Sequence, residues 1–283
     1  MELTEKYGPW AVVVGGSTGL GAGMATQAAK AGMNVALVAR RAALLEECAA
    51  ELTRSYGIEV RTAVADVGEP DATCEAVTSL TSGLTIGLLA YNAAIEEISP
   101  FLDISWNRHL AEVMGNCVTP MRLSYDIASQ MVKRGKGAII LISSLSAIQG
   151  SILTVGYGAT KAFEWILAEG LWAELHPKGL DVVGVLLGAT ATPSLLEHGV
   201  PVVPMTREEM ERADPGLTLQ NRLRNATPPM EAAEYIFSQL GKGPTIFSDP
   251  IDERVARKLL SLPRKDAVKA MVDNMQSATP GSN

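Results

Sequence analysis

Apolar runs of strand length recur along the chain, and segments with helical periodicity lie between them. This alternation is typical of βαβ units, in which helices cover both faces of a parallel sheet. It predicts an α/β fold, a doubly wound parallel sheet of the Rossmann type with about seven strands. The expected strands span residues 11–14, 35–39, 60–63, 86–91, 138–142, 182–187 and 245–247. The main expected helices span residues 20–31, 42–52, 104–132 and 157–175.

The composition argues against several function classes. A formal net charge of −7 gives no general attraction to nucleic acid or to anionic membranes. No apolar run approaches the ~20 residues that cross a bilayer, so membrane insertion is not expected. The N-terminus shows no export signal, which favours a cytoplasmic location. Three widely spaced cysteines and three scattered histidines indicate neither a disulfide framework nor a metal site.

A glycine-rich turn, GGSTGLG, follows the first expected strand and opens the first helix. Backbone N–H groups at a helix N-terminus bind anions, and glycines let a pyrophosphate approach without interference from a Cβ atom. The pattern therefore favours a dinucleotide-binding turn. Its candidate cofactor contacts are Gly15, Ser17, Thr18, Gly19, Leu20 and Gly21.

Two other interpretations of this turn stay open. One is a purely structural turn. The other is the GxSxG nucleophile elbow of a serine hydrolase, with Ser17 as the nucleophile. Fourteen residues precede Gly15, and none of them resembles the loop that supplies part of an oxyanion hole, which disfavours the hydrolase.

Two arginines follow the second expected strand, about 20 residues after the glycine turn, where the adenosine ribose is bound. An acidic residue at this place would favour NAD, whereas Arg40 and Arg41 can clamp the 2′-phosphate of NADP. The sequence thus predicts NADP(H) in preference to NAD(H), with Arg40 as the better candidate. The alternative is that both arginines only decorate the start of a helix.

Tyr157 and Lys161 lie four residues apart, so on a helix both project from one face. A phenol with a pKa near ~10 catalyses proton transfer poorly at neutral pH unless a nearby cation stabilises the phenolate. Ser144 follows the fifth expected strand, and its hydroxyl could hydrogen-bond the same carbonyl oxygen. These three residues are the candidates for catalysis.

Together these motifs resemble the short-chain dehydrogenase/reductase family over nearly the whole chain. Further matching segments are Asp66-Val67, Tyr91-Asn92-Ala93-Ala94, Asn116 and Leu187-Gly188 leading to Thr192. Residues 6–11 and 240–244 are also similar to a 17β-hydroxysteroid-dehydrogenase-like subgroup. The family's usual Asn-Asn-Ala-Gly reads Tyr-Asn-Ala-Ala here, and its Pro-Gly reads Leu-Gly, departures that bear on loop rigidity and cofactor affinity.

The resemblance implies a role for each matching residue. Tyr157 would act as general acid/base, Ser144 would polarise the substrate oxygen, and Lys161 would lower the pKa of Tyr157 and hold the nicotinamide ribose. Asn116 would position a water in the proton relay. The further implied cofactor contacts are Asp66, Val67, Asn92, Ala93, Gly188, Thr190 and Thr192. The implied reaction interconverts an alcohol and a ketone or aldehyde, with the hydride chemistry belonging to the nicotinamide.

Residues 1–250 are expected to form one dinucleotide-binding and catalytic domain, because parallel α/β folds often run to roughly 200–250 residues as one unit. Within it, residues 192–227 break the strand–helix rhythm and are expected to form an insert that covers the substrate. Residues 251–283 are expected to form a C-terminal helical extension. Its amphipathic part, 253–275, should pack on the core or on another subunit rather than on a membrane.

The expected substrate is an apolar small molecule. Candidate pocket residues are Ile95, Leu145, Ile148, Leu153, Leu195, Leu196 and Met205. The resemblance also implies that the helices 104–132 and 157–175 pair between subunits, giving a homodimer or homotetramer. A non-catalytic NADP-binding regulator remains an alternative, although the complete set of catalytic residues argues against it.

Overall fold

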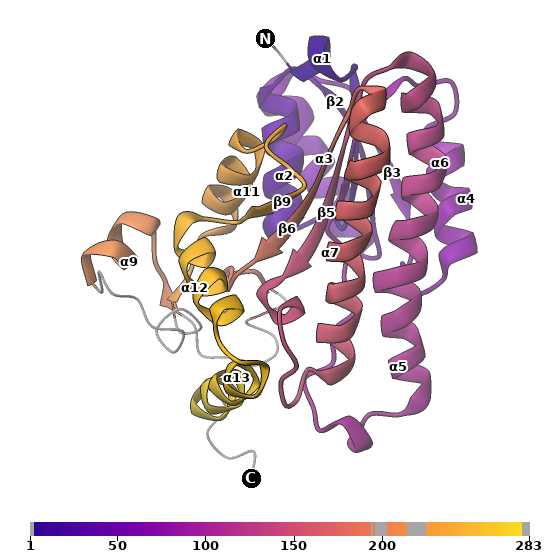
Figure 1. Cartoon of the computed structure of the whole chain (residues 1–283). Coiled ribbons are helices and arrows are strands. Elements are labelled where there is room, and N and C mark those ends of the chain that lie inside the picture. Colours follow the sequence, from indigo (N-terminus) through magenta and orange to yellow (C-terminus); the bar gives the residue numbers. More distant parts are fainter. Residues whose placement is uncertain (1–2, 194, 196–202, 214–224, 279–283) are drawn as a thin grey trace.

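A seven-stranded sheet forms the centre of the molecule (Figure 1). The computed structural model describes residues 3–193, 195, 203–213 and 225–278. From one edge to the other, the strands are β3 (Val60–Val64), β2 (Asn34–Ala39), β1 (Trp10–Val14), β4 (Ile86–Tyr91), β5 (Gly137–Ser144), β6 (Leu180–Leu187) and β9 (Thr245–Phe247). All neighbouring strands are parallel. Each expected strand is present, and the prediction of a doubly wound α/β fold is confirmed.

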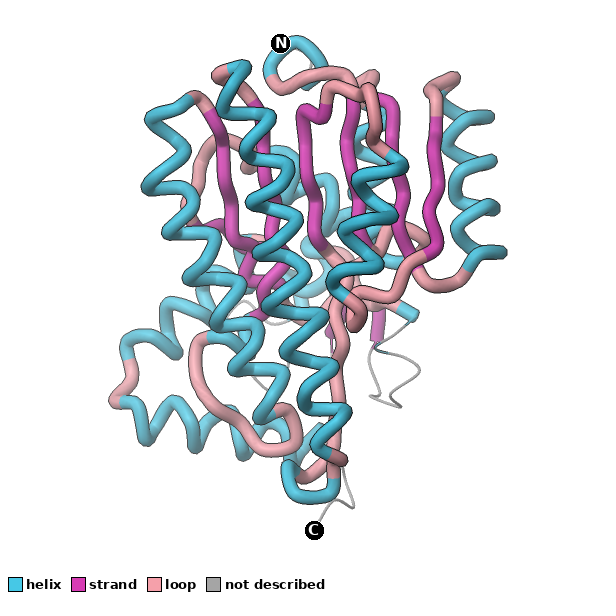
Figure 2. Tube along the Cα trace, turned by 90° about the vertical axis from the view of Figure 1, so that its right-hand side faces the viewer, coloured by secondary structure: helices cyan, strands magenta, loops and turns pink. Residues whose placement is uncertain are grey.

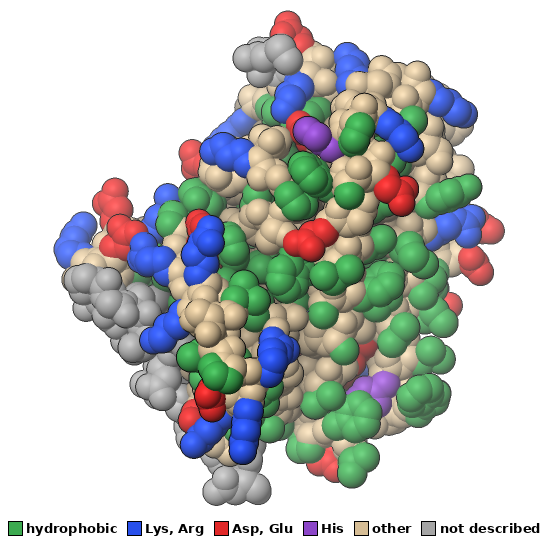
Figure 3. Space-filling view, in the orientation of Figure 1, with side chains coloured by type: hydrophobic (Ala, Val, Ile, Leu, Met, Phe, Trp, Pro, Cys, Tyr) green, Lys and Arg blue, Asp and Glu red, His purple; other side chains and the backbone are tan. Residues whose placement is uncertain are grey.

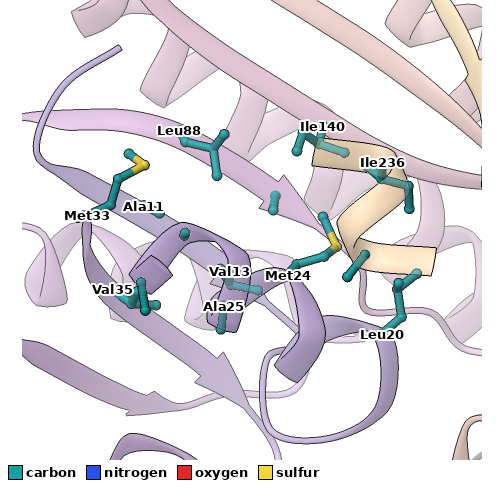
Figure 4. Packing of buried hydrophobic residues seen from close by; sticks show 14 of the residues in the cluster. Ala11, Val13, Leu20, Met24, Ala25, Met33, Val35, Leu88, Ile140 and Ile236 are labelled. Carbon is teal, nitrogen blue, oxygen red and sulfur yellow. The ribbon is translucent and has the colours of Figure 1, made fainter. Parts of the chain in front are cut away.

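Helices pack on both faces of the sheet (Figure 2). One face is covered by α2 (Gly19–Lys30), α3 (Ala42–Tyr56) and α11 (Pro229–Ser238). The other is covered by α4 (Pro70–Leu80), α6 (Thr119–Arg134) and α7 (Val155–Leu175). Successive side chains of a strand point to opposite faces, so Ala11 and Val13 of β1 join the first cluster, whereas Val12 and Val14 join the second. Figure 4 shows the first cluster, where Leu20 and Met24 of α2 meet Ile236 of α11.

The helix expected over residues 104–132 is interrupted, and that prediction was wrong in detail. It consists of α5 (Trp106–Val113), one π-helical turn, η2 (Met114–Val118), and α6. Pro120 has no N–H to donate to the carbonyl of Asn116, four residues earlier, so a regular helical ladder cannot pass this point. The interruption falls on a candidate catalytic residue.

The amphipathic segment expected over residues 253–275 is two helices, α12 (Pro250–Ser261) and α13 (Arg264–Ala278). Pro263 stands between them, where a proline prevents α12 from continuing. Val255 and Leu259 of α12 and Met271 of α13 are buried in a third apolar cluster with Leu186 of β6. The expectation that this segment packs on the core is therefore confirmed for the buried positions.

The described parts of the insert are short. They comprise β7 (Val203–Pro204), α9 (Arg207–Ala213) and β8 (Asn225–Ala226). β7 and β8 pair in parallel, and Thr190 bridges Thr227. The remaining short elements are α1 (Leu3–Lys6), η1 (Phe101–Asp103), η3 (Leu145–Ala147) and η4 (His176–Lys178). Among the helices of the described residues, none combines the length and the apolar character that crossing a bilayer requires.

Candidate active site

A cleft of about 510 Å³ opens at the carboxyl ends of the central strands. The strand order reverses between β1 and β4, whose connections leave in opposite directions, and this is where doubly wound sheets bind their ligands. The cleft is lined by residues at or just after the carboxyl ends of β1 to β6, by the start of α2, and by the first two turns of α7. The fold thus brings the glycine turn, the two arginines, Tyr157 and Lys161 to one cleft.

The glycine turn has a backbone shape that side chains would prevent. Gly15 has a φ of +82°, and a Cβ there would lie 2.7 Å from the backbone nitrogen of Ala93. A Cβ on Gly21 would collide with the carbonyl oxygen of Gly15. Asn92 fixes the turn from the next strand, because its Nδ2 donates to the same Gly15 oxygen over 3.2 Å. The turn is therefore packed tightly against the end of β4.

The N-terminus of α2 fits a phosphate group. Thr18 precedes the helix but makes no side-chain capping bond, and the first turn carries no acidic residue. The first backbone N–H groups of a helix lack partners within the helix and attract anions. Four residues at this end line the cleft: Ser17, Thr18, Gly19 and Leu20. This geometry is what the pyrophosphate of a dinucleotide requires.

Arg40 and Arg41 follow β2 at the rim of the cleft. Arg41 donates through Nη2 to the Thr18 hydroxyl over 3.0 Å, which ties it to the glycine turn. Arg40 lies 3.8 Å from the Asp66 carboxylate, and its side chain is 64% exposed. Exposed ion pairs of this length contribute little, so the Arg40 guanidinium can turn to a stronger anion such as a phosphate.

Tyr157 and Lys161 lie at the other end of the cleft, on α7. Lys161 is 1% exposed, and its Nζ donates to the Ile142 carbonyl over 2.8 Å. The Nζ atom stands 5.7 Å from the centre of the Tyr157 ring. Burial raises the pKa of Tyr157 well above its usual value, Glu96 and Glu164 raise it further, and a hydrogen bond with Ser144 lowers it. The site therefore holds a protonated phenol beside a serine hydroxyl and a buried cation.

Asn116 is fully buried in η2 and does not line the cleft. Its side-chain amide donates to the Ile95 carbonyl over 2.8 Å and to the Thr160 hydroxyl over 3.0 Å, and its oxygen accepts from the Ile95 N–H. These bonds join the loop after β4 to the residue before Lys161. Asn116 therefore holds the loop after β4 against α7.

Most predicted site residues lie together. Those that line the cleft are Gly15, Ser17, Thr18, Gly19, Leu20, Arg40, Arg41, Val67, Asn92, Ala93, Tyr157, Lys161 and Thr192. Those that do not line it are Gly21, Asp66, Asn116, Ser144, Gly188 and Thr190. Among the latter, Ser144 still contacts Tyr157, and the Gly188 N–H donates to Ser248 Oγ over 3.0 Å.

The apolar pocket candidates are divided. Ile95 lines the cleft. Leu145 and Ile148 instead pack against α12 and α13 in the third apolar cluster, because these helices cover the chain segment after β5. Leu153 is buried, and Leu195 and Met205 are half-buried. None of these three residues lines the cleft. Leu196 lies outside the described residues.

Sequence reasoning missed two charged residues of the cleft, Glu96 and Arg108. Glu96 follows β4 by five positions, and its charge acts on Tyr157. Arg108, on α5, pairs closely with Glu97. The signal that could have revealed them is the place of Glu96-Glu97 directly after the strand that carries Asn92. Together Glu96 and Arg108 add two charged side chains to the lining of the cleft.

The geometry offers no support for a hydrolase. Ser17 lines the cleft, but neither histidine of the described residues does. His109 Nε2 hydrogen-bonds the Phe101 carbonyl over 3.0 Å, and His176 stacks on Trp172. Ser17 therefore has no imidazole base beside it in the part of the chain that the structure describes.

Comparisons with known proteins agree with this geometry. The short chain dehydrogenase family model matches residues 9–198. A 7beta-hydroxysteroid dehydrogenase of Mediterraneibacter gnavus is 33% identical over 248 residues, which cover 88% of this chain and 89% of that protein.

Two solved structures extend the likeness to three dimensions. A 7beta-hydroxysteroid dehydrogenase structure superposes with a TM-score of 0.83 at 29% identity, covering 96% of this chain and 99% of that one. A short-chain dehydrogenase from Sphingobium yanoikuyae in complex with NADPH gives a TM-score of 0.71 at 27% identity, covering 97% and 98%. The fold, the cleft and these relatives together establish that the chain belongs to the short-chain dehydrogenase/reductase family of oxidoreductases.

Proposed function

We propose that the protein is an NADP(H)-dependent oxidoreductase that interconverts an alcohol and a ketone or aldehyde on an apolar small molecule. The observation that carries this proposal is the cleft that joins three features: an uncapped helix N-terminus, a pair of arginines, and the Tyr157–Lys161 pair. Ser144 lies outside the cleft lining but hydrogen-bonds Tyr157. The NADPH complex of the Sphingobium relative supports the choice of cofactor. The preference over NAD(H) rests on Arg40 and Arg41.

The residues present suit carbonyl reduction. When bound, the nicotinamide supplies the hydride. Ser144 donates a hydrogen bond to the carbonyl oxygen, and Tyr157 donates its phenolic proton to that oxygen as the alcohol forms. The buried Lys161 ammonium stabilises the phenolate that remains. In the reverse direction the Tyr157 phenolate accepts the proton of the alcohol.

Hydroxysteroids are the substrate class that the relatives favour. The M. gnavus and structural relatives are both 7beta-hydroxysteroid dehydrogenases, and they match almost the whole of this chain. A steroid needs a wide apolar surface with a few polar groups for orientation. Ile95 supplies apolar surface, Glu96 and Arg108 supply a polar rim, and the 192–227 insert would cover the bound molecule.

Apolar side chains on α5, α6 and α7 support a homodimer or homotetramer. Figure 3 shows hydrophobic side chains gathered over the α5 and α7 side of the molecule. Exposed members of these helices are Trp106, Leu110, Val113, Met121, Tyr125, Val155, Phe163 and Ile166. A contiguous apolar surface of this kind is typical of a subunit interface.

Three unpaired cysteines are consistent with a cytoplasmic enzyme.

The experiment that tests the proposal combines binding and turnover. NADPH and NADH are titrated separately, and a panel of hydroxysteroids and ketosteroids, aromatic ketones and acyl-chain ketones is then followed at the nicotinamide absorbance. The proposal expects tighter binding of NADPH and reduction of at least one ketone. Tight binding of NADPH without turnover across the panel would favour the non-catalytic regulator. Ester hydrolysis that is lost in Ser17→Ala would favour the hydrolase.

A further inference from the structure

A buried carboxylate stands directly behind the catalytic lysine. Glu164 lies one turn after Lys161 on α7 and is 0% exposed. Its Oε2 accepts a hydrogen bond from Lys161 Nζ over 2.7 Å, and Lys161 itself is 1% exposed. The other carboxylate oxygen, Oε1, has no hydrogen-bond partner among the described residues. The Glu164 carboxylate takes no direct part in the proposed proton transfer from Tyr157.

Glu164 limits what Lys161 can contact. A lysine ammonium has three N–H donors. One is taken by the Ile142 carbonyl and a second by Glu164, so a single donor is left for the cleft that Lys161 lines. A long, flexible side chain held at two points has a fixed head group. The carboxylate therefore sets the direction of the remaining donor.

Glu164 also offsets the positive charge of Lys161. Among the described residues, the titratable groups of neighbouring elements on which the charge of Glu164 acts are Tyr91 of β4 and Cys117 of η2, and neither is a cation. Burial raises the pKa of Glu164 to about 7, while its contact with Lys161 opposes the rise. Above that pH the two side chains form a neutral buried pair beside Tyr157. Such pairs are costly to bury, which points to a role beyond stability.

Resting on the proposed function, we propose that Glu164 is a positioning residue: it fixes the Lys161 ammonium between its own carboxylate and the Ile142 carbonyl, and it offsets the positive charge that would otherwise help Tyr157 to release its proton. Reduction consumes this proton, which passes from the Tyr157 hydroxyl to the carbonyl oxygen. Oxidation needs the phenolate instead. The charge of Glu164 thereby favours the protonation state in which the enzyme reduces a carbonyl.

Two other carboxylates near Tyr157 also favour its protonated form, although they lie outside the Lys161–Glu164 pair. Glu96, after β4, and Glu112, on α5, also raise the pKa of Tyr157. Glu112 faces His109 over 3.6 Å and accepts the backbone N–H of Glu97. Of these three carboxylates, Glu164 alone also accepts a hydrogen bond from Lys161, so its removal should change both the charge near Tyr157 and the position of Lys161.

The charge effect can be measured without turnover. The protein is labelled with [13Cζ]tyrosine, and the Tyr157 resonance is identified by its loss in Tyr157→Phe. We expect the phenolate midpoint of Tyr157 to fall by about one pH unit in Glu164→Gln, the size that one charge several ångströms away produces at a partly screened site. Glu164→Met provides a second uncharged variant of similar volume, and Glu164→Asp keeps the charge.

Glu169→Gln is the matched control, because Glu169 lies on the same helix but bonds Thr245 rather than Lys161. It should leave the Tyr157 midpoint unchanged, as should Glu164→Asp. The inference is overturned if Glu164→Gln and Glu164→Met both keep the wild-type midpoint. It is overturned equally if the control moves the midpoint as far as they do.

Turnover separates this inference from the function on which it rests. If alcohol oxidation occurs, its acidic pH limit should move about one unit lower in Glu164→Gln, and the alkaline limit of reduction should move with it. Unchanged limits would contradict the positioning role. A lowered Tyr157 midpoint in a protein that turns over no carbonyl would support the charge effect and refute the reductase function.

Discussion

Replacing Arg40 by alanine should weaken NADPH binding while leaving NADH binding nearly unchanged. Arg40 stands at the rim of the cleft, and in the structure it pairs only loosely with Asp66, at 3.8 Å. A hydrogen bond to a charged group contributes about 1.5–3 kcal/mol, and the lower end applies because the side chain is 64% exposed. About 1.5 kcal/mol corresponds to a roughly tenfold rise in the Kd of NADPH.

The assay is a fluorescence titration of both nucleotides at constant ionic strength, because exposed charges are screened by salt. Arg54→Ala is the matched control, since Arg54 is an exposed arginine on α3 that does not line the cleft. Arg40→Ala combined with Arg41→Ala should lower the preference further, because Arg41 bonds the glycine turn. A double variant that still binds NADPH much more tightly than NADH would refute the claim that these arginines bind the 2′-phosphate.

Three further predictions concern the glycine turn, the ion pair at Asp181 and the exposed apolar surface of α7. Gly21→Ala should lower the free energy of unfolding by about 1–3 kcal/mol and weaken NADPH binding, because the new Cβ would collide with Gly15. Gly170→Ala is the control and should change neither, because a Cβ there meets nothing within 4 Å. Equal unfolding midpoints of the two variants in denaturant would contradict the prediction. Burial favours the neutral acid at Asp181, but hydrogen bonds from Lys6 and Tyr7 outweigh it and hold the pKa below its usual value. The ionised Asp181 therefore contributes to folding stability above about pH 4, and this contribution is lost as the pH falls further. Asp181→Asn should lower the free energy of unfolding at pH 7 and make it depend less on pH in the acid range. An unchanged acid profile would refute this prediction. Ile166→Asp should give monomers in analytical ultracentrifugation, whereas Leu260→Asp on α12 should not, and a wild-type sedimentation profile for Ile166→Asp would exclude this interface.

Most of the strands could be predicted because they are short, largely apolar runs bounded by turn residues. β1 and β4 are buried at every position, and such runs in a parallel sheet need no alternation to be recognised. The glycine turn and the Tyr157–Lys161 pair were equally accessible, since their spacing along one element fixes their relation in space.

Features that depend on contacts between distant segments were not accessible. The buried setting of Asn116 includes hydrogen bonds to Ile95 and Thr160, which are far from it in sequence. Leu145 and Ile148 follow a strand end, where pocket residues are expected, but the C-terminal helices cover them. Glu164 is an ordinary polar residue in the sequence, and only the packing of α7 on the sheet shows that it is buried against Lys161.

The central claim is that Tyr157 transfers the proton in an NADPH-dependent reduction, and Tyr157→Phe tests it most directly. The variant removes one hydroxyl from a residue that lines the cleft and leaves the glycine turn and both arginines in place. Ketone reduction should fall by about 10²–10⁴-fold while the Kd of NADPH stays within a few fold of wild type. A Tyr157→Phe enzyme that still reduces the ketone at close to the wild-type rate would contradict the account.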